Sequence, residues 1–348
     1  MTVLSLPRGR ARRVSLRFHP RTVIVSVALA IVALVLVVVA TGTGDFPIAP
    51  LDVVRTLIGA GDRVNDFIIF GLRLPRVIVA VMCGLALGMA GAIFQSLSKN
   101  PLGSPEIVGF TNGSATGALV MILIFGSDQT GIALGAVGSG ALTALLVYAL
   151  AFKRGAQGYR LILVGIAIGA ALTSVNSYLL TRARVDDAQQ AAVWLIGSLN
   201  ARSWSQVWPL AIGLLLLVPA ALALGRGLDA LEMGDDAARA LGVRVESTRG
   251  WLLVVGVGLT AAATAAAGPI GFVALAAPHL ARRLTKAAGA GIVPAGLMGA
   301  VLLLVSDQAA ERLIPGVQLP VGVMTGAVGG LYLIGLLAFQ WRRERTTA

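Results

Sequence analysis

Residues 73–113 read RLPRVIVAVMCGLALGMAGAIFQSLSKNPLGSPEIVGFTNG, and this stretch decides the fold. Its centre, residues 77–94, is an apolar run of 18 residues without a charge. An α-helix of that length is close to the minimum that crosses the hydrocarbon layer of a bilayer. A polar turn follows, and then Ser104-Pro105-Glu106 supplies a cap, a proline for the first helical turn and an acid for the positive end of the helix dipole. The stretch therefore predicts a membrane hairpin of two helices.

The composition of the whole chain indicates a polytopic membrane protein. Hydrophobic residues make up 57% and charged residues 13% of the 348 residues, whereas soluble domains carry about 25% charged residues. The net charge is +12, but the sequence contains no soluble basic domain that could bind nucleic acid, so nucleic acid is not an expected partner. Cys83 is the only cysteine, and His19 and His279 are the only histidines, so we expect no disulfide and no metal site.

The apolar runs predict an all-α chain of ten transmembrane helices in a single domain, residues 1–348. Within it, residues 1–21 are expected to form a basic cytosolic tail. The first run is too long for the core of a signal peptide, which favours a retained helix. Residues 41–72 and 182–205 are polar enough to lie outside the membrane. The predicted helices cover approximately residues 22–40, 73–96, 104–125, 131–152, 160–181, 206–225, 250–267, 272–285, 291–311 and 320–340.

The distribution of basic residues predicts the orientation of these helices. With the N-terminus inside, 20 of the 28 lysines and arginines fall on inner segments and eight on outer segments. Cytoplasmic loops of membrane proteins carry this excess of positive charge. Because ten crossings return the chain to its starting side, both termini are expected to be cytoplasmic.

The polar segment 226–249 is predicted to form two short amphipathic helices separated by Gly234-Asp235-Asp236. Their apolar faces need a cover, which is either the membrane surface or a partner protein. The residues alone leave these two possibilities open.

Three further features suggest where function lies. Small and polar residues form one stripe on the helix 160–181, which favours close helix packing and also suits a wet path. Asp307 lies deep in a predicted span, where a structural hydrogen bond is favoured over a proton relay. Arg73 and Arg76 lie at an outer mouth, where they either reach lipid headgroups or dock a partner. The sequence holds no Walker A motif, nucleophile elbow or metal signature, so the chain is not expected to be an enzyme.

Several motifs together resemble one family. They are RLPR with NPLGSPEIVGF in the opening stretch, GDDAARALGV at 234–243, AGPIGFVALAAPHLARR at 267–283 and QLPVG at 318–322. Over about residues 20–340 the chain resembles the iron-siderophore and vitamin B12 permeases of ABC importers, and its GSPEIVGF variant is most similar to that of ferric-enterobactin permease subunits.

This resemblance implies a fold like that of a type II ABC importer permease, in the plasma membrane. It implies a second permease subunit, for which an unlike subunit in a heterodimer is favoured over an identical one in a homodimer. It also implies two cytosolic ATPases that hold ATP and Mg, an extracytoplasmic siderophore-binding protein, and a ferric siderophore that keeps its iron inside the chelator. No cofactor is expected on this chain.

The resemblance also assigns roles to residues at matching positions. The ATPase-coupling residues would be Gly234, Asp235, Ala238, Arg239, Leu241 and Gly242. Docking of the binding protein would use Arg73, Arg76 and Arg312, although Glu311 stands where relatives often have the third arginine. The cytoplasmic gate would comprise Asn100, Leu102, Gly158 and Tyr159, and the translocation path Thr173, Asn176 and Ser177.

Two other classes of protein stay as alternatives. A secondary transporter driven by an ion gradient needs a midplane site, for which only Asp307 and the break at Pro278 speak. A membrane enzyme would need paired acids or a nucleophile with its base, and neither is visible. Within the importer class, a catecholate siderophore is favoured over hydroxamate, haem or cobalamin.

Overall fold

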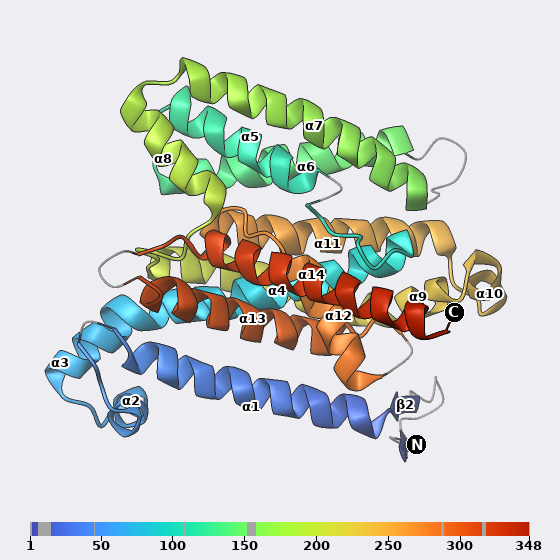
Figure 1. Cartoon of the computed structure of the whole chain (residues 1–348), viewed down its shortest axis with the longest axis horizontal. Coiled ribbons are helices and arrows are strands. Elements are labelled where there is room, and N and C mark those ends of the chain that lie inside the picture. Colours follow the sequence, from blue (N-terminus) through green and yellow to red (C-terminus); the bar gives the residue numbers. More distant parts are fainter. Residues whose placement is uncertain are drawn as a thin grey trace.

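The computed structural model describes residues 2–5, 15–44, 46–106, 109–151, 158–286, 289–314 and 318–347. Apart from one short hairpin, the regular structure in these ranges is helical (Figure 1). The hairpin pairs β1 (Thr2–Ser5) with β2 (Ser15–Phe18) in antiparallel register. It lies within the predicted N-terminal tail, where no strand was expected.

Ten of the helices correspond to the predicted membrane segments. They are α1 (Pro20–Gly42), α4 (Leu74–Ser98), α5 (Phe110–Leu123), α6 (Gln129–Ala151), α7 (Gly158–Arg182), α9 (Trp204–Glu232), α11 (Val245–Ala267), α12 (Val273–Thr285), α13 (Ile292–Arg312) and α14 (Val321–Thr347). Shorter connecting helices are α2 (Pro50–Leu57), α3 (Arg63–Asp66), the π-helical η1 (Phe67–Arg73), α8 (Val185–Ile196) and α10 (Asp235–Ala240).

The prediction of a helical protein with several membrane spans is confirmed. Among the described residues, seven helical stretches are long and apolar enough to cross a bilayer by themselves. The helix α5 and the described apolar part of α14, residues 321–332, are shorter. The helix α12 has only 13 residues and contains Pro278. Every predicted segment thus overlaps a helix, but length and apolarity alone support seven spans.

The helix α4, which begins directly after Arg73, is the centre of the fold. It is buried over most of its length and packs against α9, α11, α12 and α13. Its glycines permit this packing, because a Cβ at Gly88 would collide with the carbonyl oxygen of Ala295, and one at Gly91 with that of Ala274. Small residues allow helix backbones in membranes to approach in this way.

The predicted start of the helix that follows α4 is wrong. Residues 104–106 are not helical, and α5 begins at Phe110 after Gly109. The backbone of Gly109 is left-handed, with φ +83°, and a Cβ there would lie 2.7 Å from the carbonyl oxygen of Gly165. The cap-and-proline pattern was overridden because the chain first enters the protein as an irregular, buried segment, in which Ser104 and Pro105 are covered.

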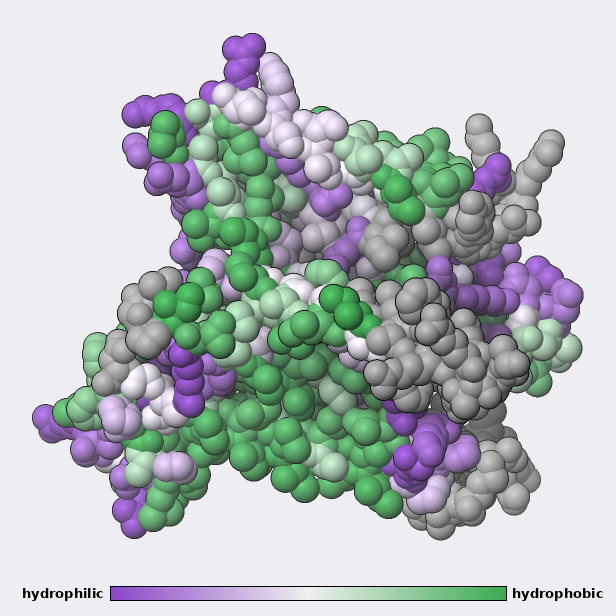
Figure 2. All heavy atoms as spheres, viewed as in Figure 1, coloured by the Kyte–Doolittle hydropathy of each residue, from purple (hydrophilic) through white to green (hydrophobic). Residues whose placement is uncertain are grey.

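The outer surface of the bundle suits a bilayer. Side chains of α1 such as Ile24, Ile31 and Leu34 are apolar and more than half exposed. In Figure 2 apolar surface fills the lower centre of the molecule, over α1 and its neighbours, while polar residues gather toward the two ends. The ends of the bundle are therefore the places where polar partners or substrate can bind.

Candidate functional site

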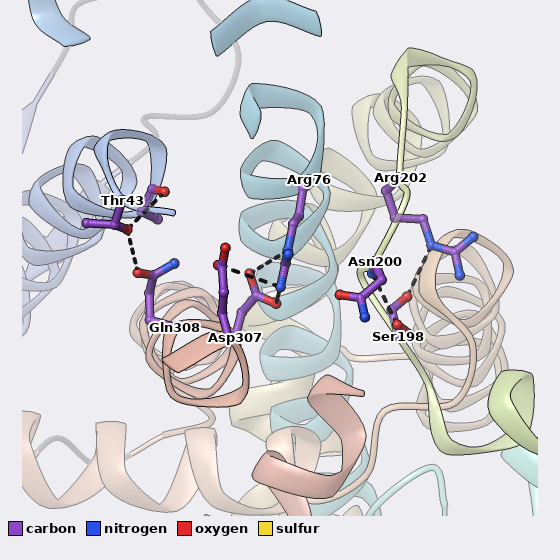
Figure 3. Close-up of polar contacts among 9 residues, drawn as sticks. Thr43, Arg76, Ser198, Asn200, Arg202, Asp307 and Gln308 are labelled. Atoms are coloured by element: carbon purple, nitrogen blue, oxygen red, sulfur yellow. Dashed lines mark hydrogen bonds and ion pairs between the residues drawn. The ribbon is translucent and has the colours of Figure 1, made fainter. Parts of the chain in front are cut away.

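The end of the bundle where α4 begins and α13 ends holds a buried ion pair (Figure 3). Arg76 donates from Nε to Oδ2 of Asp307 over 3.1 Å and from Nη2 to Oδ1 over 2.8 Å. The Asp307 side chain is 2% exposed and that of Arg76 is 15% exposed. Glu311, one turn further along α13, lies 3.8 Å from Nη2 of Arg76. The pair ties the central helix to α13, in line with a structural role for Asp307.

Two neighbouring contacts attach α1 to the same end. Arg73 donates from Nη1 to the carbonyl oxygen of Thr41 over 3.1 Å and from Nη2 to that of Phe46 over 2.6 Å. Thr43 donates to Oε1 of Gln308 over 3.0 Å. Arg73 and Arg76, which the resemblance assigned to docking, are therefore both engaged within the chain.

Two other arginines also lie at this end. Arg202, between α8 and α9, donates from Nε to the carbonyl oxygen of Ser198 over 3.1 Å (Figure 3). Arg312 is the last residue of α13 and is exposed. Of the three residues expected to dock the binding protein, Arg312 is thus the exposed one, and docking by any of them stays a prediction.

The opposite end carries α10, which protrudes from the bundle in Figure 1. Gly234, with φ +110°, ends the preceding helix, and α10 follows at once. Ala238 faces inward and is fully buried, whereas Met233 and Leu241 are both 64% exposed. Arg249 of α11 donates from Nη2 to Oδ1 of Asp235 over 3.0 Å. The result is a fixed short helix flanked by exposed apolar side chains.

The expectation of two short helices in residues 226–249 is half right. The break at Gly234 and the second helix are present, but residues 226–232 continue α9, and α11 begins already at Val245. Leu228 and Leu231 are buried against the bundle, so the first part needs no partner to cover it. The predicted coupling residues then divide by exposure. Ala238 is buried, Gly234 and Asp235 are half-buried, and Arg239, Leu241 and Gly242 are exposed.

Two of the predicted gate residues form the turn after α4. Oδ1 of Asn100 accepts from the backbone N–H of Leu102 over 2.9 Å, which is the turn chemistry expected of an asparagine. The Leu102 side chain is 49% exposed. Gly158 and Tyr159 are the first two residues of α7, and the Tyr159 side chain lies outside the described part of the chain.

The predicted path residues lie on the face of α7 that meets α5. Nδ2 of Asn112 donates to Oγ1 of Thr173 over 3.2 Å, and Thr116 donates to Oδ1 of Asn176 over 2.7 Å. Asn176 is 8% exposed, whereas Thr173 and Ser177 are exposed. The stripe therefore packs against α5 at Asn176 and opens outward at Thr173 and Ser177. Their role in a path stays a prediction.

Sequence reasoning missed Glu106, which it assigned to a helix dipole. Oε2 of Glu106 instead accepts from the backbone N–H of Phe272 over 3.3 Å, just before α12 begins. It also missed a cluster at the other end of α4, where Ser96 donates to Glu232 and accepts from Arg282. The only sequence signal for these contacts was the placement of polar side chains beside long apolar runs.

Within the described ranges, no three His, Cys, Asp or Glu side chains group closely enough to hold a metal ion. The polar features described above fall into three kinds. They are ion pairs that join helices, a protruding helix at one end, and hydroxyl and amide groups between α5 and α7.

Comparison with known proteins gives a consistent result. Residues 30–339 match the model of the FecCD transport family. The chain is 46% identical over 302 residues to the ferric enterobactin transport system permease protein FepG of Escherichia coli, covering 87% of this chain and 92% of the relative. It is 38% identical to the Fe(3+)-citrate import system permease protein YfmE of Bacillus subtilis, covering 87% and 91%. The structure of the chain resembles that of a metal-chelate type ABC transporter solved in an inward-facing conformation. The TM-score is 0.79 and the sequence identity is 27%, and the match covers 91% of this chain and 99% of the other.

Proposed function

The chain belongs to the FecCD transport family and is a permease subunit of an importer for siderophores or similar metal chelates, and we propose that it carries a ferric catecholate siderophore. The observation that supports this substrate is the identity of 46% to a ferric enterobactin permease over most of both chains. A catecholate chelate binds iron by itself, so no iron ligand is needed from the protein.

We further propose that ten helices cross the membrane, with both termini in the cytoplasm. Besides the seven long spans, we count the short helices α5 and α12 and the helix α14, whose described apolar part is residues 321–332. Irregular backbone at membrane depth is tolerated where protein covers it, as around residues 104–106. Figure 1 shows α10 and the marked chain ends at one end of the bundle, in keeping with an even number of crossings.

The helix α10 is proposed as the contact with a separate ATPase subunit. Met233 and Leu241, which flank α10, expose apolar surface, and Arg239 on α10 is exposed beside its ion-pair partner Asp236. Because Asp235 forms an ion pair with Arg249 of α11, a displacement of α10 would be transmitted to a long membrane helix. A second, unlike permease subunit and two ATPases would complete the importer on this side, with a siderophore-binding protein at the end that carries Arg312.

The test is co-purification of the chain with the ATPase encoded beside it, comparing Leu241→Asp with Leu313→Asp. Both leucines are 64% exposed, but Leu313 lies at the opposite end of the bundle, after α13. We expect Leu241→Asp to lose the ATPase and Leu313→Asp to retain it. Equal recovery from both variants would remove α10 from the contact.

A transport measurement in proteoliposomes tests the function itself. We expect the assembled transporter to take up a radiolabelled ferric catecholate only with its binding protein outside and ATP inside. Uptake driven by an ion gradient without ATP would instead support a secondary transporter. The structure gives little support to a secondary transporter, because Asp307, the acid that such a transporter would use, is paired with Arg76.

A further inference from the structure

An apolar groove runs between α6 and α11. Its volume is about 640 Å³, within the range of roughly 300–1,000 Å³ typical of sites for small molecules. The walls are formed by Val137, Ala141 and Leu145 of α6 and by Trp251, Val254 and Ala261 of α11.

The groove opens on the outer surface of the chain. Leu145, Trp251 and Val254 all line it, and each is more than half exposed. The lining residues extend from Val137 to Tyr148 on α6, which is about 16 Å at the helical rise of 1.5 Å per residue. One leaflet of the hydrocarbon layer is about 15 Å thick. The groove therefore has the length of an extended lipid tail.

One end of the groove is polar. There Tyr148 of α6 meets Glu246 and Ser247 at the start of α11, beside α10. The Glu246 side chain is 49% exposed. The nearby Arg249 is only 11% exposed, with Nη2 3.0 Å from Asp235 and Nη1 3.9 Å from Glu246. The groove thus ends in the half-exposed carboxylate of Glu246 and the hydroxyl group of Ser247, and the buried Arg249 is shared between Glu246 and Asp235.

We propose that this groove binds one phospholipid with a primary ammonium headgroup, such as phosphatidylethanolamine. An acyl chain lies against Ala141, Trp251 and Val254, and the ammonium group pairs with Glu246. Ser247 offers a hydroxyl group beside the headgroup. An anionic lipid is disfavoured, because its headgroup would bring net negative charge to the half-exposed Glu246 carboxylate, and the nearby Arg249 is only 11% exposed and already lies 3.0 Å from Asp235. The lipid is then linked to α10 by two ion pairs, Glu246 with Arg249 and Arg249 with Asp235.

The tail site is tested by native mass spectrometry of the full-length chain in its assembled transporter, purified in mild detergent. Ala141→Phe fills the groove, whereas the matched control Leu142→Phe adds a ring next to it, at a position that does not line the groove and is 64% exposed. We expect the wild type and Leu142→Phe to retain one lipid and Ala141→Phe to lose it. Equal retention by the two variants overturns the tail site, and a thermal unfolding scan confirms that both are folded.

The headgroup is tested by competition in nanodiscs of defined composition. We expect the wild type, exposed to an equal mixture of phosphatidylethanolamine and phosphatidylglycerol, to retain the former at least threefold in excess. Glu246→Gln should abolish this preference, and Glu246→Asp should keep part of it. An unchanged ratio in Glu246→Gln, or a wild-type preference for phosphatidylglycerol, overturns the headgroup assignment. ATPase co-purification by these variants reports on the proposed function separately, so the two proposals fail independently.

Discussion

Breaking the ion pair between Arg76 and Asp307 should destabilise the chain more than any other single loss of charge at this end. At the observed 2.8 Å, two unit charges attract by about 6 kcal/mol at an effective dielectric constant near 20. The desolvation of both groups offsets most of this attraction. Removing one partner, however, leaves the other charge buried, which costs about 3–5 kcal/mol, or roughly 150- to 5,000-fold in the unfolding equilibrium.

The two single variants should differ. After Asp307→Asn, Arg76 still has Glu311 at 3.8 Å as a partner. After Arg76→Met, Asp307 has no other ion-pair partner among the described residues, and its side chain is only 2% exposed. We therefore expect Arg76→Met to be the more destabilising change. The double variant Arg76→Met with Asp307→Leu should recover much of the loss, because it removes both charges together.

The assay is equilibrium unfolding of the purified chain in mixed micelles with increasing denaturing detergent, followed by tryptophan fluorescence. Asp52→Asn is the matched control, since it breaks the exposed pair of Asp52 and Arg55 in α2, with side chains 45% and 58% exposed. Such a surface pair contributes about 0–1 kcal/mol. If Asp307→Asn unfolds like Asp52→Asn, or if the double variant loses the sum of the two single losses, the reasoning is refuted.

Three further predictions concern packing and the connections between helices. Gly88→Val should prevent folding, because its side chain meets a carbonyl group of α13, whereas Gly330→Ala in open space on α14 should fold normally; expression and gel filtration distinguish them. Glu106→Ala should cost about 1–3 kcal/mol by leaving an amide before α12 unpaired, and Glu106→Gln should cost less, as measured by the same unfolding assay. Arg249→Met should preserve ATPase binding but weaken the dependence of ATP hydrolysis on substrate, because α10 loses its tie through Asp235; unchanged stimulation would count against that link.

Much of the architecture could be predicted from local sequence. Apolar runs located the ten helices that correspond to the predicted membrane segments, including α4, which the structure places at the centre of the bundle. The start of α5 could not be predicted in this way. Ser104-Pro105-Glu106 has the pattern of a helix start, yet Glu106 is engaged by an amide 166 residues away in the chain. A local rule cannot include such a distant partner.

The candidate site was predicted less completely than the fold. Residues of the α10 segment were located by motif, because Gly234 and the acids after it specify a break and a new helix. The pairing of Arg76 with Asp307 was not foreseen, although both residues had been singled out. The hydrogen bond from Thr116 of α5 to Asn176 was not foreseen either, and the role of Asn176 in a path stays a prediction.

By itself the sequence determined that this chain crosses a membrane several times, where its helices run and to which family its motifs point. These properties follow from hydrophobic periodicity and from short motifs, which act over a few residues. Only the tertiary structure decided which polar groups are already engaged and which stay accessible. Arg76 is satisfied by Asp307 while Arg312 and Leu241 are exposed, and the groove between α6 and α11 exists only where two distant helices meet. The physical reason is that burial and pairing depend on neighbours brought together by packing, and packing is a property of the whole chain.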